Sequence, residues 1–415
     1  MSIIWESRYA QRARGITSSM IRELLKLTQR PEVISFAGGL PAAEYFPVDR
    51  FKAACDRVLT NSAHEALQYS TTEGYLPLRE MIADRMRRDN VNVSADNVMI
   101  TSGSQQALSL LGALLINPGD HVLVEQPTYL GALQAFAAFQ AQYVGVTADD
   151  NGICTDQIPA ALRYGPKFMY ILPNFQNPGG VTINAERRLE LVRMASESGV
   201  PIVEDDPYGE LRFEGEHIAP LVAYDADYVG SNGDCYSGNV IYLSTFSKTL
   251  APGLRTAWVV APPEVIYKLT QLKQGADLHT SIFDQMVLYE VAKDGFIDSH
   301  IELLRTVYRK RRDAMLGALD RFMPPSVSWT QPQGGLFLWM NLPQDTTAVD
   351  VFDAAIKRDV AFVPGDAFFT VDNPPPCARV NFSLMDEARI TEGIKRLGEA
   401  IDDVQRAASK TVPAN

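Results

Sequence analysis

The chain has 415 residues, of which 46% are hydrophobic and 21% are charged, and its net charge is −12. This composition is that of a globular protein with a large core, and the acidity argues against nucleic acid as a partner. No apolar run approaches membrane-spanning length, and the N-terminal residues lack the apolar segment of a secretory signal, so we expect a cytoplasmic protein.

The spacing of cysteine and histidine gives no sign of a metal site. The four cysteines lie far apart in the sequence, and the five histidines form no close pair of the kind that binds zinc. We therefore expect reduced thiols and no bound metal.

The first part of the chain predicts helices separated by loops. Apolar residues at helical spacing indicate a helix from Ser18 to Gln29. The string FAGGLP then forms a loop, in which the pair that includes Gly39 lets the backbone approach a ligand, although a connecting turn explains the pair as well. Amphipathic helices at Phe51–Leu59 and Leu78–Arg88 follow, joined by a polar loop with Tyr69 at its edge.

Strands and helices then alternate along the chain. We expect strands at Val98–Thr101 and Lys167–Leu172, a helix at Ala185–Ser198, and further strands leading into the strings EQPTY and EDDPY. Alternation of this kind implies an α/β fold, with a mainly parallel sheet covered by helices on both faces. The loops that follow the strands should then meet at one edge of the sheet.

Two of these loops carry candidate binding groups. Ser104 and Gln105 begin a helix after a strand and a glycine, where free N–H groups suit an anion; an ordinary capped helix is an equal alternative. The string EDDPY ends a strand with Asp205 and Asp206 and continues to Tyr208. Carboxylates at such a position are poorly placed for a core and well placed for a ligand crevice.

The stretch VIYLSTFSKTLAPGLRTAWVVA is the most informative part of the sequence. Two apolar strands, Val240–Leu243 and Ala257–Ala261, enclose a loop with Lys248 at its centre. Hydroxyls and a guanidinium in the same loop suit a phosphate ester. Apolar walls and a neighbouring cation would lower the pKa of the lysine, so that its neutral amine attacks an aldehyde. Pyridoxal 5'-phosphate combines both groups, whereas a solvated loop lysine is the alternative.

From about Ile282 the pattern becomes helical, with a basic helix at Ile301–Leu319, and then gives short strands with turns. This change indicates a smaller α+β domain at the C-terminal end. We therefore expect three parts: an N-terminal arm at residues 1–45 that packs with the small domain, a large cofactor-binding domain at residues 46–295, and the small domain at residues 296–415.

Ten strings in chain order resemble the PLP-dependent aminotransferases of fold type I, over essentially the full length. They are FAGGLP, LQYSTTEGYLPLRE, TSGSQQAL, EQPTY, PNFQNPGG, EDDPYGEL, TFSKTLAPGLR, PQGGLFLW, FVPGDAFF and ARVNFS. The opening SSMIRELLKLTQRPEVISFAGGLPAAE is similar to the branch with 2-aminoadipate, kynurenine and broad-range aromatic or branched-chain aminotransferases. The resemblance implies a homodimer that moves the amino group of an L-amino acid, including glutamate, to a 2-oxo acid such as 2-oxoglutarate.

The resemblance also implies a role for each candidate residue. Lys248 would hold the cofactor through a Schiff base and, once its amine is free, would carry the proton between the substrate Cα and the cofactor. Asp205 would pair with the pyridine nitrogen; Asp206 is its rival, but the family's spacing to the tyrosine favours Asp205. Asn177 and Tyr208 would hydrogen-bond the phenolic oxygen of the cofactor.

The remaining contacts follow from the same resemblance. Tyr129 would stack on the pyridine ring, and Tyr69 would reach in from the second subunit of a dimer. Arg379 would bind the substrate α-carboxylate as a planar fork, with Asn177 and Gly39 beside the substrate. The phosphate would be held by Ser104, Gln105, Thr245, Ser247 and Arg255.

Substrate range has two signals. In similar proteins an arginine at the place of Arg22 meets the side-chain carboxylate of acidic substrates and swings away for apolar ones; a solvated arginine on the helix face is the equal alternative. At Ser244 and at Thr256-Ala257 many relatives carry glycines, so we expect these residues to narrow the cavity.

Two other kinds of function remain open at this stage. A β-lyase, a decarboxylase or an amino-acid oxidase would use the same cofactor and differ in which Cα bond breaks. A PLP-sensing transcription regulator would need a DNA-binding module, which the short segment before FAGGLP and the acidic charge argue against.

Overall fold

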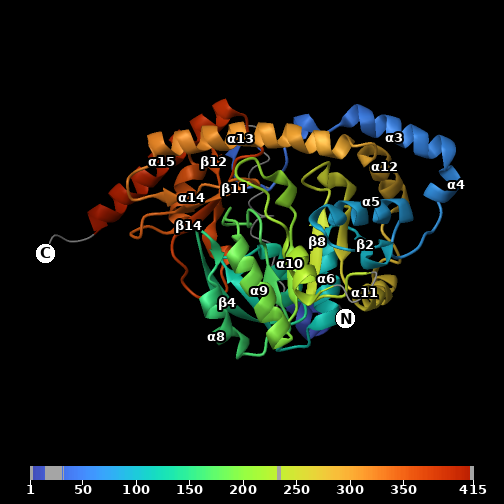
Figure 1. The fold of residues 1–415 in the computed structure, drawn as a ribbon. Helices are drawn as coiled ribbons and strands as arrows, with labels where there is room; N and C mark the ends of the chain where they lie inside the picture. The colour runs from blue at the N-terminus through green and yellow to red at the C-terminus, as the bar shows by residue number, and fades with distance from the viewer. Residues whose placement is uncertain (1–2, 15–29, 31, 231–234, 412–415) are drawn as a thin grey trace.

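The computed structural model describes residues 3–14, 30, 32–230 and 235–411 (Figure 1). The predicted helix from Ser18 to Gln29, which carries Arg22, lies outside these residues. The described chain forms a larger region around an eight-stranded sheet and a smaller region around a four-stranded sheet. None of the helices in the described ranges is both long and apolar enough to cross a bilayer.

The large sheet is mainly parallel, which confirms the predicted α/β fold. Strands β8, β7, β6, β3 and β4 are parallel, whereas β9 is antiparallel to both of its neighbours and β5 is antiparallel to β4. In spatial order the strands are β2 (Val98–Thr101), β9 (Ala257–Val260), β8 (Val240–Thr245), β7 (Ile202–Asp205), β6 (Met169–Ile171), β3 (His121–Gln126), β4 (Gln142–Asp149) and β5 (Gly152–Ile153).

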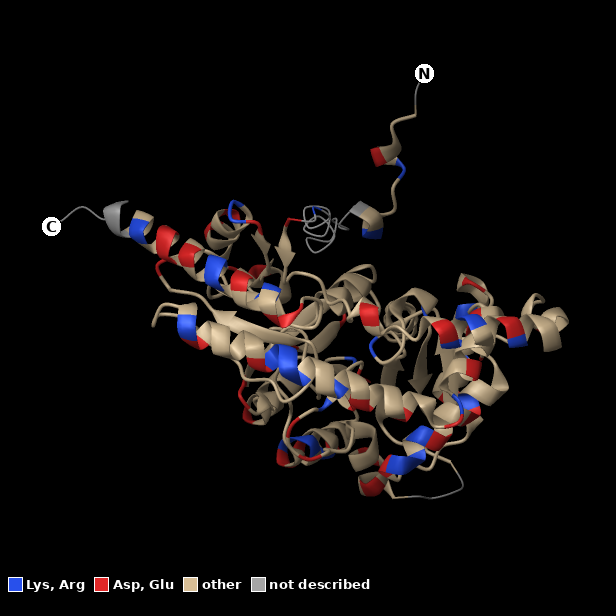
Figure 2. Cartoon of the chain, turned by 90° about the horizontal axis from the view of Figure 1, so that it is seen from above, with Lys and Arg blue, Asp and Glu red and all other residues tan. Residues whose placement is uncertain are grey.

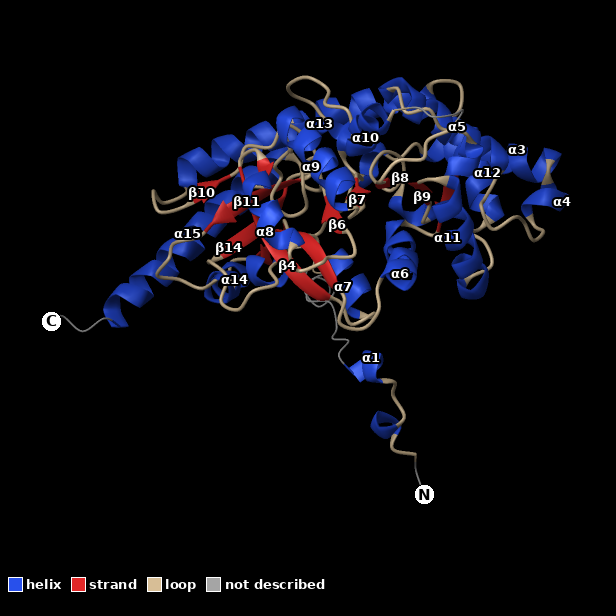
Figure 3. Cartoon of the chain, turned by 60° about the horizontal axis from the view of Figure 1, so that its bottom comes forward, coloured by secondary structure: helices blue, strands red, loops and turns tan. Residues whose placement is uncertain are grey.

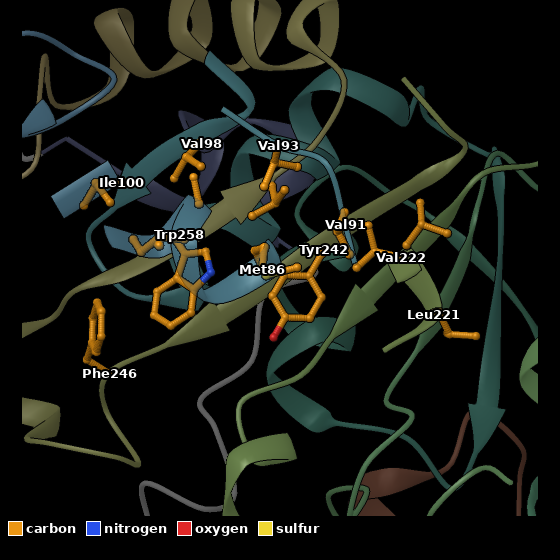
Figure 4. Packing of buried hydrophobic residues seen from close by; sticks show 14 of the residues in the cluster. Met86, Val91, Val93, Val98, Ile100, Leu221, Val222, Tyr242, Phe246 and Trp258 are labelled. Atoms are coloured by element: carbon orange, nitrogen blue, oxygen red, sulfur yellow. The ribbon is translucent and has the colours of Figure 1, made fainter. Parts of the chain in front are cut away.

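Helices cover both faces of this sheet (Figure 3), because successive strand residues point to opposite faces and both sets are apolar. Ile202 and Tyr242 pack with one cluster, part of which Figure 4 shows, and Val203 and Leu243 with the other. The first face is covered by α3 (Val48–Asn61), α5 (Leu76–Met86), α8 (Ile158–Leu162), α9 (Ala185–Ser198), α10 (Leu221–Val229) and α12 (Ile282–Ala292), and the second by α6 (Ser104–Leu115), α7 (Leu130–Ala137) and α11 (Pro263–Ala276).

The smaller region has its own apolar cluster around an antiparallel sheet. Early residues join it, because β1 (Ile34–Ser35) pairs in parallel with β12 (Val360–Ala361). The other elements are β10 (Ser328–Trp329), β11 (Phe337–Asn341), β13 (Val363–Pro364), β14 (Cys377–Asn381), α14 (Ala348–Ile356) and α15 (Glu387–Thr411); short helices α1 (Gln11–Arg14) and α4 (Ala63–Ala66) lie elsewhere.

One long helix, α13 (Phe296–Phe322), runs along the top of the molecule in Figure 1 and belongs to both regions. Ile297 and Ile301 pack in the cluster of the large region, and residues from Leu304 to Leu319 pack in that of the small region. The predicted basic helix at Ile301–Leu319 is therefore present but longer at both ends. The predicted division at residues 45 and 295 stays a prediction, because α13, which begins directly after residue 295, packs in the clusters of both regions.

Charged side chains are spread along the outer helices, with basic and acidic residues interspersed (Figure 2). Arg358, for example, pairs with Glu399 and Asp403 of α15. The four cysteines are free. Within the described residues, no cluster of three His, Cys, Asp or Glu side chains could hold a metal ion.

Candidate active site

A cavity of about 280 Å³ lies where the carboxyl ends of the parallel strands meet the small region. This is the position at which parallel sheets bind their ligands. Among the described residues, all of the predicted site residues except Tyr69 line the cavity: Gly39, Ser104, Gln105, Tyr129, Asn177, Asp205, Tyr208, Thr245, Ser247, Lys248, Arg255 and Arg379.

Asp205, the last residue of β7, presents a carboxyl group to this cavity. The Tyr170 hydroxyl donates to Oδ2 at 2.7 Å, and Oδ1 has no hydrogen-bond partner among the described residues. Burial raises the pKa of Asp205 to about 7. A buried carboxyl with one free oxygen suits a protonated ring nitrogen, which would restore its charged form.

Asp206 faces the opposite side of the sheet. Its Oδ1 accepts from Asn174 Nδ2 at 3.1 Å and from the Gly209 amide at 2.9 Å, and the residue does not line the active-site cavity. The alternation of side chains along a strand therefore separates the two neighbouring acids, and only Asp205 is available to a ligand in this cavity.

Lys248 is the nucleophile candidate of the site. Its Nζ donates to the carbonyl oxygen of Gly39 at 2.8 Å. Burial, followed by the charges of Arg379 and Arg255, lowers its pKa to about 8. A substantial fraction of the amine is therefore neutral near pH 7.5 and able to attack an aldehyde.

One end of the cavity suits a phosphate group. Helix α6 begins at Ser104, whose hydroxyl is buried without a hydrogen-bond partner among the described residues. Gly103 has φ +83°, and a Cβ there would collide with Nη2 of Arg255, so the glycine lets the guanidinium approach the helix start. The Thr245 hydroxyl donates a hydrogen bond to the Ser247 hydroxyl at 2.9 Å, and both residues line the same cavity. Amides, hydroxyls and one guanidinium together form an anion cup.

Arg379 is held rigidly by two hydrogen bonds and two aromatic rings. Its Nη1 donates to Asn177 Oδ1 at 2.8 Å and its Nη2 to the Ala37 carbonyl at 2.7 Å. The guanidinium lies over the rings of Phe337, at 4.4 Å, and Phe368, at 5.1 Å. Burial lowers its pKa to about 10, so it keeps its charge at neutral pH. A fixed, charged fork of this kind suits a carboxylate.

Two sets of predicted residues lie away from the cavity. The expectation that Ser244, Thr256 and Ala257 narrow the cavity is wrong, because none of them lines it and Ser244 Oγ donates to the Asp206 carbonyl oxygen behind it. Tyr69 lies outside the cavity with 79% of its surface exposed.

Four lining residues and the aromatic support of Arg379 are not among the predicted site residues. Phe337 stands in the string PQGGLFLW, but its contact with the guanidinium depends on the pairing of β11 with β14, which no local pattern gives. The other missed residues are Leu172, Pro207 and Pro252.

Comparison with known proteins decides the family. A family model described as aminotransferase class I and II matches residues 32–397. The chain belongs to this family. The cofactor of this aminotransferase is pyridoxal 5'-phosphate, since similar solved aminotransferases are complexed with derivatives of it. The residues present fit that cofactor, since an anion cup, a lysine and an unpartnered buried carboxyl line one cavity.

Similar proteins span nearly the whole aminotransferase. The aromatic-amino-acid aminotransferase 1 of Thermococcus litoralis is 45% identical, with 96% of this chain and 95% of that protein covered. The 2-aminoadipate transaminase of Thermus thermophilus is 44% identical, with 96% and 97% covered. The crystal structure of an alpha-aminoadipate aminotransferase from the same species, complexed with N-(5'-phosphopyridoxyl)-L-leucine, has a TM-score of 0.90 at 41% identity, with 98% and 100% covered.

Proposed function

We propose that this aminotransferase takes the amino group from an L-amino acid of the 2-aminoadipate, glutamate, aromatic or branched-chain type and gives it to 2-oxoglutarate or another 2-oxo acid. The observation that carries the proposal is the convergence of Lys248, Asp205 and Arg379 on one cavity. The relatives named for 2-aminoadipate and for aromatic amino acids support the choice of donors.

Each residue has one task in this proposal. Lys248 binds the cofactor covalently at rest and, when its amine is free, moves a proton at the substrate Cα. Asp205 keeps the pyridine nitrogen protonated, while Tyr208 and Asn177 donate to the phenolic oxygen. Bound pyridoxal phosphate supplies the electron sink that makes the Cα proton removable. Burial raises the pKa of the Tyr208 hydroxyl, which supports its role as a donor.

The remaining residues bind and orient. Tyr129 stacks on the ring, and Arg379 fixes the substrate α-carboxylate beside Gly39, so that the Cα hydrogen points toward Lys248. Arg22 binds the side-chain carboxylate of an acidic substrate. The phosphate is held by Ser104, Gln105, Thr245, Ser247 and Arg255.

We further propose a cytoplasmic homodimer in which Tyr69 completes the site of the partner subunit. The exposure of Tyr69 supports this, because a large aromatic side chain left in solvent is typical of an interface. The free cysteines are consistent with a reducing compartment.

The test is a half-reaction followed by absorbance. Purified enzyme should be yellow, lose this colour when an amino donor is added without an acceptor, and regain it with a 2-oxo acid. Lys248→Ala should abolish the cycle. Normal turnover by Lys248→Ala, or no colour change with any L-amino acid in a broad panel, would remove the proposal. Ammonia, carbon dioxide or peroxide released without an acceptor would instead indicate a lyase, a decarboxylase or an oxidase.

Substrate choice is tested separately with Arg22→Ala. If Arg22 reads a side-chain carboxylate, the variant should lose about tenfold or more in kcat/KM for 2-aminoadipate and glutamate and keep its activity with leucine and phenylalanine. Equal losses for both groups of donors would contradict this role.

A further inference from the structure

Behind the active site, on the reverse face of the large sheet, a buried arginine ties several loops together. Arg188 of α9 is fully buried, and its guanidinium makes four hydrogen bonds. Its acceptors are the carbonyl oxygens of Ile183 at 2.9 Å, Ala219 at 2.7 Å and Pro173 at 3.0 Å, and the side-chain Oδ1 of Asn174 at 2.6 Å. Three of these acceptors belong to the loop after β6, so Arg188 fixes that loop from behind.

Asn174, which accepts a hydrogen bond from Arg188, also donates one to Asp206. Its Nδ2 donates to Asp206 Oδ1 at 3.1 Å, and the same oxygen accepts from the Gly209 amide at 2.9 Å. The backbone of Asp206 is bonded to β8 on both sides, through its amide to the Leu243 carbonyl at 2.9 Å and through its carbonyl to Ser244 Oγ at 2.8 Å. Asp206 therefore links the loop after β6 with the loop after β7 and with the sheet.

These two loops carry the proposed donors to the phenolic oxygen. Asn174 precedes Asn177 by three residues in one loop, and Asp206 precedes Tyr208 by two residues in the other. The first loop belongs to no helix or strand, backbone hydrogen bonds of Gln176 and Ile183 hold part of it, and Phe175 in it has a positive φ of 46°. A positive φ at a residue other than glycine is strained and persists where surrounding contacts, here those of Arg188 and Asn174, hold the loop in place.

We propose that Arg188, Asn174 and Asp206 are positioning residues, which keep the neighbouring side chains of Asn177 and Tyr208 together at the cavity without touching the cofactor. The inference rests on the proposed roles of Asn177 and Tyr208. A hydrogen bond donated to the phenolic oxygen of the cofactor stabilises negative charge on that oxygen. The Lys248 nitrogen bonded to the cofactor then loses its proton at lower pH. If the two donors drift apart, that proton is held to higher pH, and the colour change of the bound cofactor moves in the same direction.

The experiment compares two buried asparagines in the cofactor-loaded enzyme. Asn174→Ala breaks the connection. Asn97→Ala is the matched control, because Asn97 is also buried and donates to the carbonyl oxygens of Tyr236 and Ala261, at the end of the sheet away from the cavity. Visible absorbance is titrated against pH, and Tm, kcat and KM are measured for each variant.

We expect Asn174→Ala to raise the midpoint of the colour change by about 0.5 pH unit or more and to lower kcat about tenfold. Asn97→Ala should lower Tm and leave the midpoint unchanged. Asp206→Asn keeps an acceptor at Oδ1 and should stay close to the wild-type midpoint, whereas Asp206→Ala should shift it. Should Asn174→Ala fail to fold, Arg188→Lys takes its place, because a lysine cannot reach all four acceptors and should raise the midpoint.

The outcomes separate this inference from the proposed function. An unchanged midpoint in Asn174→Ala, or an equal shift in Asn97→Ala, overturns the positioning role while the wild-type enzyme still shows its half-reaction. A wild-type enzyme that shows no half-reaction with any L-amino acid overturns the proposed function and, with it, this inference, whereas a half-reaction with a visible band that does not change with pH overturns this inference alone.

Discussion

Lys248 shows how the surroundings of one residue prepare it for chemistry. Burial and two guanidinium groups disfavour its charged form and bring its pKa to about 8. Cofactor-free enzyme should therefore become reactive at Lys248 at a lower pH than an ordinary lysine. Reductive methylation with formaldehyde, followed by mass spectrometry, should give a labelling midpoint near pH 8, with the exposed Lys52 as an internal control for the reagent. A midpoint at pH 10 or above would contradict the prediction.

Asp205 and Asp206 are neighbouring acids that point to opposite faces of the sheet and so have different partners. Asp205→Asn removes the carboxylate that would hold the pyridine nitrogen in its protonated form, so kcat/KM should fall by about a hundredfold or more, while Tm changes little. Asp206→Asn is the matched control and should lose far less. Steady-state kinetics with one donor and one acceptor decide between the two, and equal losses would count against the assignment.

Glu125 links stability to pH. It is fully buried, its Oε2 accepts from the Leu172 amide at 2.8 Å, and burial raises its pKa from 4.5 to about 8. The folded protein therefore holds a proton that the unfolded chain releases above about pH 4.5. The stabilisation is complete below that pH and is lost as the pH rises toward 8.

Glu125→Gln replaces the protonated carboxyl with a neutral amide and removes this dependence. The Tm of the cofactor-free variant, relative to that of the cofactor-free wild type, should rise by about 3 °C between pH 6 and pH 8.5. Glu204, whose pKa burial also raises to about 8, still contributes its own share in both proteins. A constant difference in Tm across this range, measured by scanning fluorimetry, would show that Glu125 does not titrate there.

At the scale of elements, the turn between β2 and α6 decides how close Arg255 comes to the helix start. Gly103→Ala places a methyl group against the guanidinium, so the dissociation constant for pyridoxal phosphate should rise about tenfold to a hundredfold. Gly119→Ala is the control: Gly119 also has a positive φ, of 88°, but a Cβ there meets no atom within 4 Å. Equilibrium dialysis measures both, and equal weakening would indicate backbone strain alone.

Local patterns predict elements well where both the periodicity and the ends are marked. The strand at Val98–Thr101 and the helix at Ala185–Ser198 have their predicted bounds, and the helix begins after Asn184, whose side chain accepts from the Arg187 amide. The ends of α13 are not marked in this way. It starts after Gly295 without a side-chain cap and continues to Phe322, so its length depends on packing against two regions.

The active site likewise has features that local sequence predicts and features that depend on the folded sheet. Loops that follow parallel strands can be predicted to converge, and this brought Ser104, Asp205 and Lys248 to one cavity. The aromatic rings around Arg379 and the separation of Asp205 from Asp206 depend on strand pairing and on the alternation of faces in the folded sheet. Alternation itself is a local rule, but which face borders the cavity and which rings surround Arg379 follow only from the folded sheet.

At the scale of the whole molecule, the exposed Tyr69 packs edge-on against His279, and the neighbouring Leu67 is 74% exposed. If Tyr69 completes the partner's site, Tyr69→Ala and Lys248→Ala should each be nearly inactive alone. Subunits of both variants mixed and re-associated form hybrid dimers with one intact site, and about a quarter of the wild-type activity should return. Sedimentation checks the dimer, and no recovery in verified hybrids would place Tyr69 outside the partner's site.

Helix α13 fixes the position of the small region relative to the large region. Its 27 residues pass from one core to the other between Ile301 and Leu304. One extra residue inserted there would turn everything beyond it by about 100° and advance it by about 1.5 Å. The fork of Arg379 would then no longer face the amine of Lys248, so a single codon, far from the cavity, would disconnect substrate from nucleophile while leaving every side chain of the site intact.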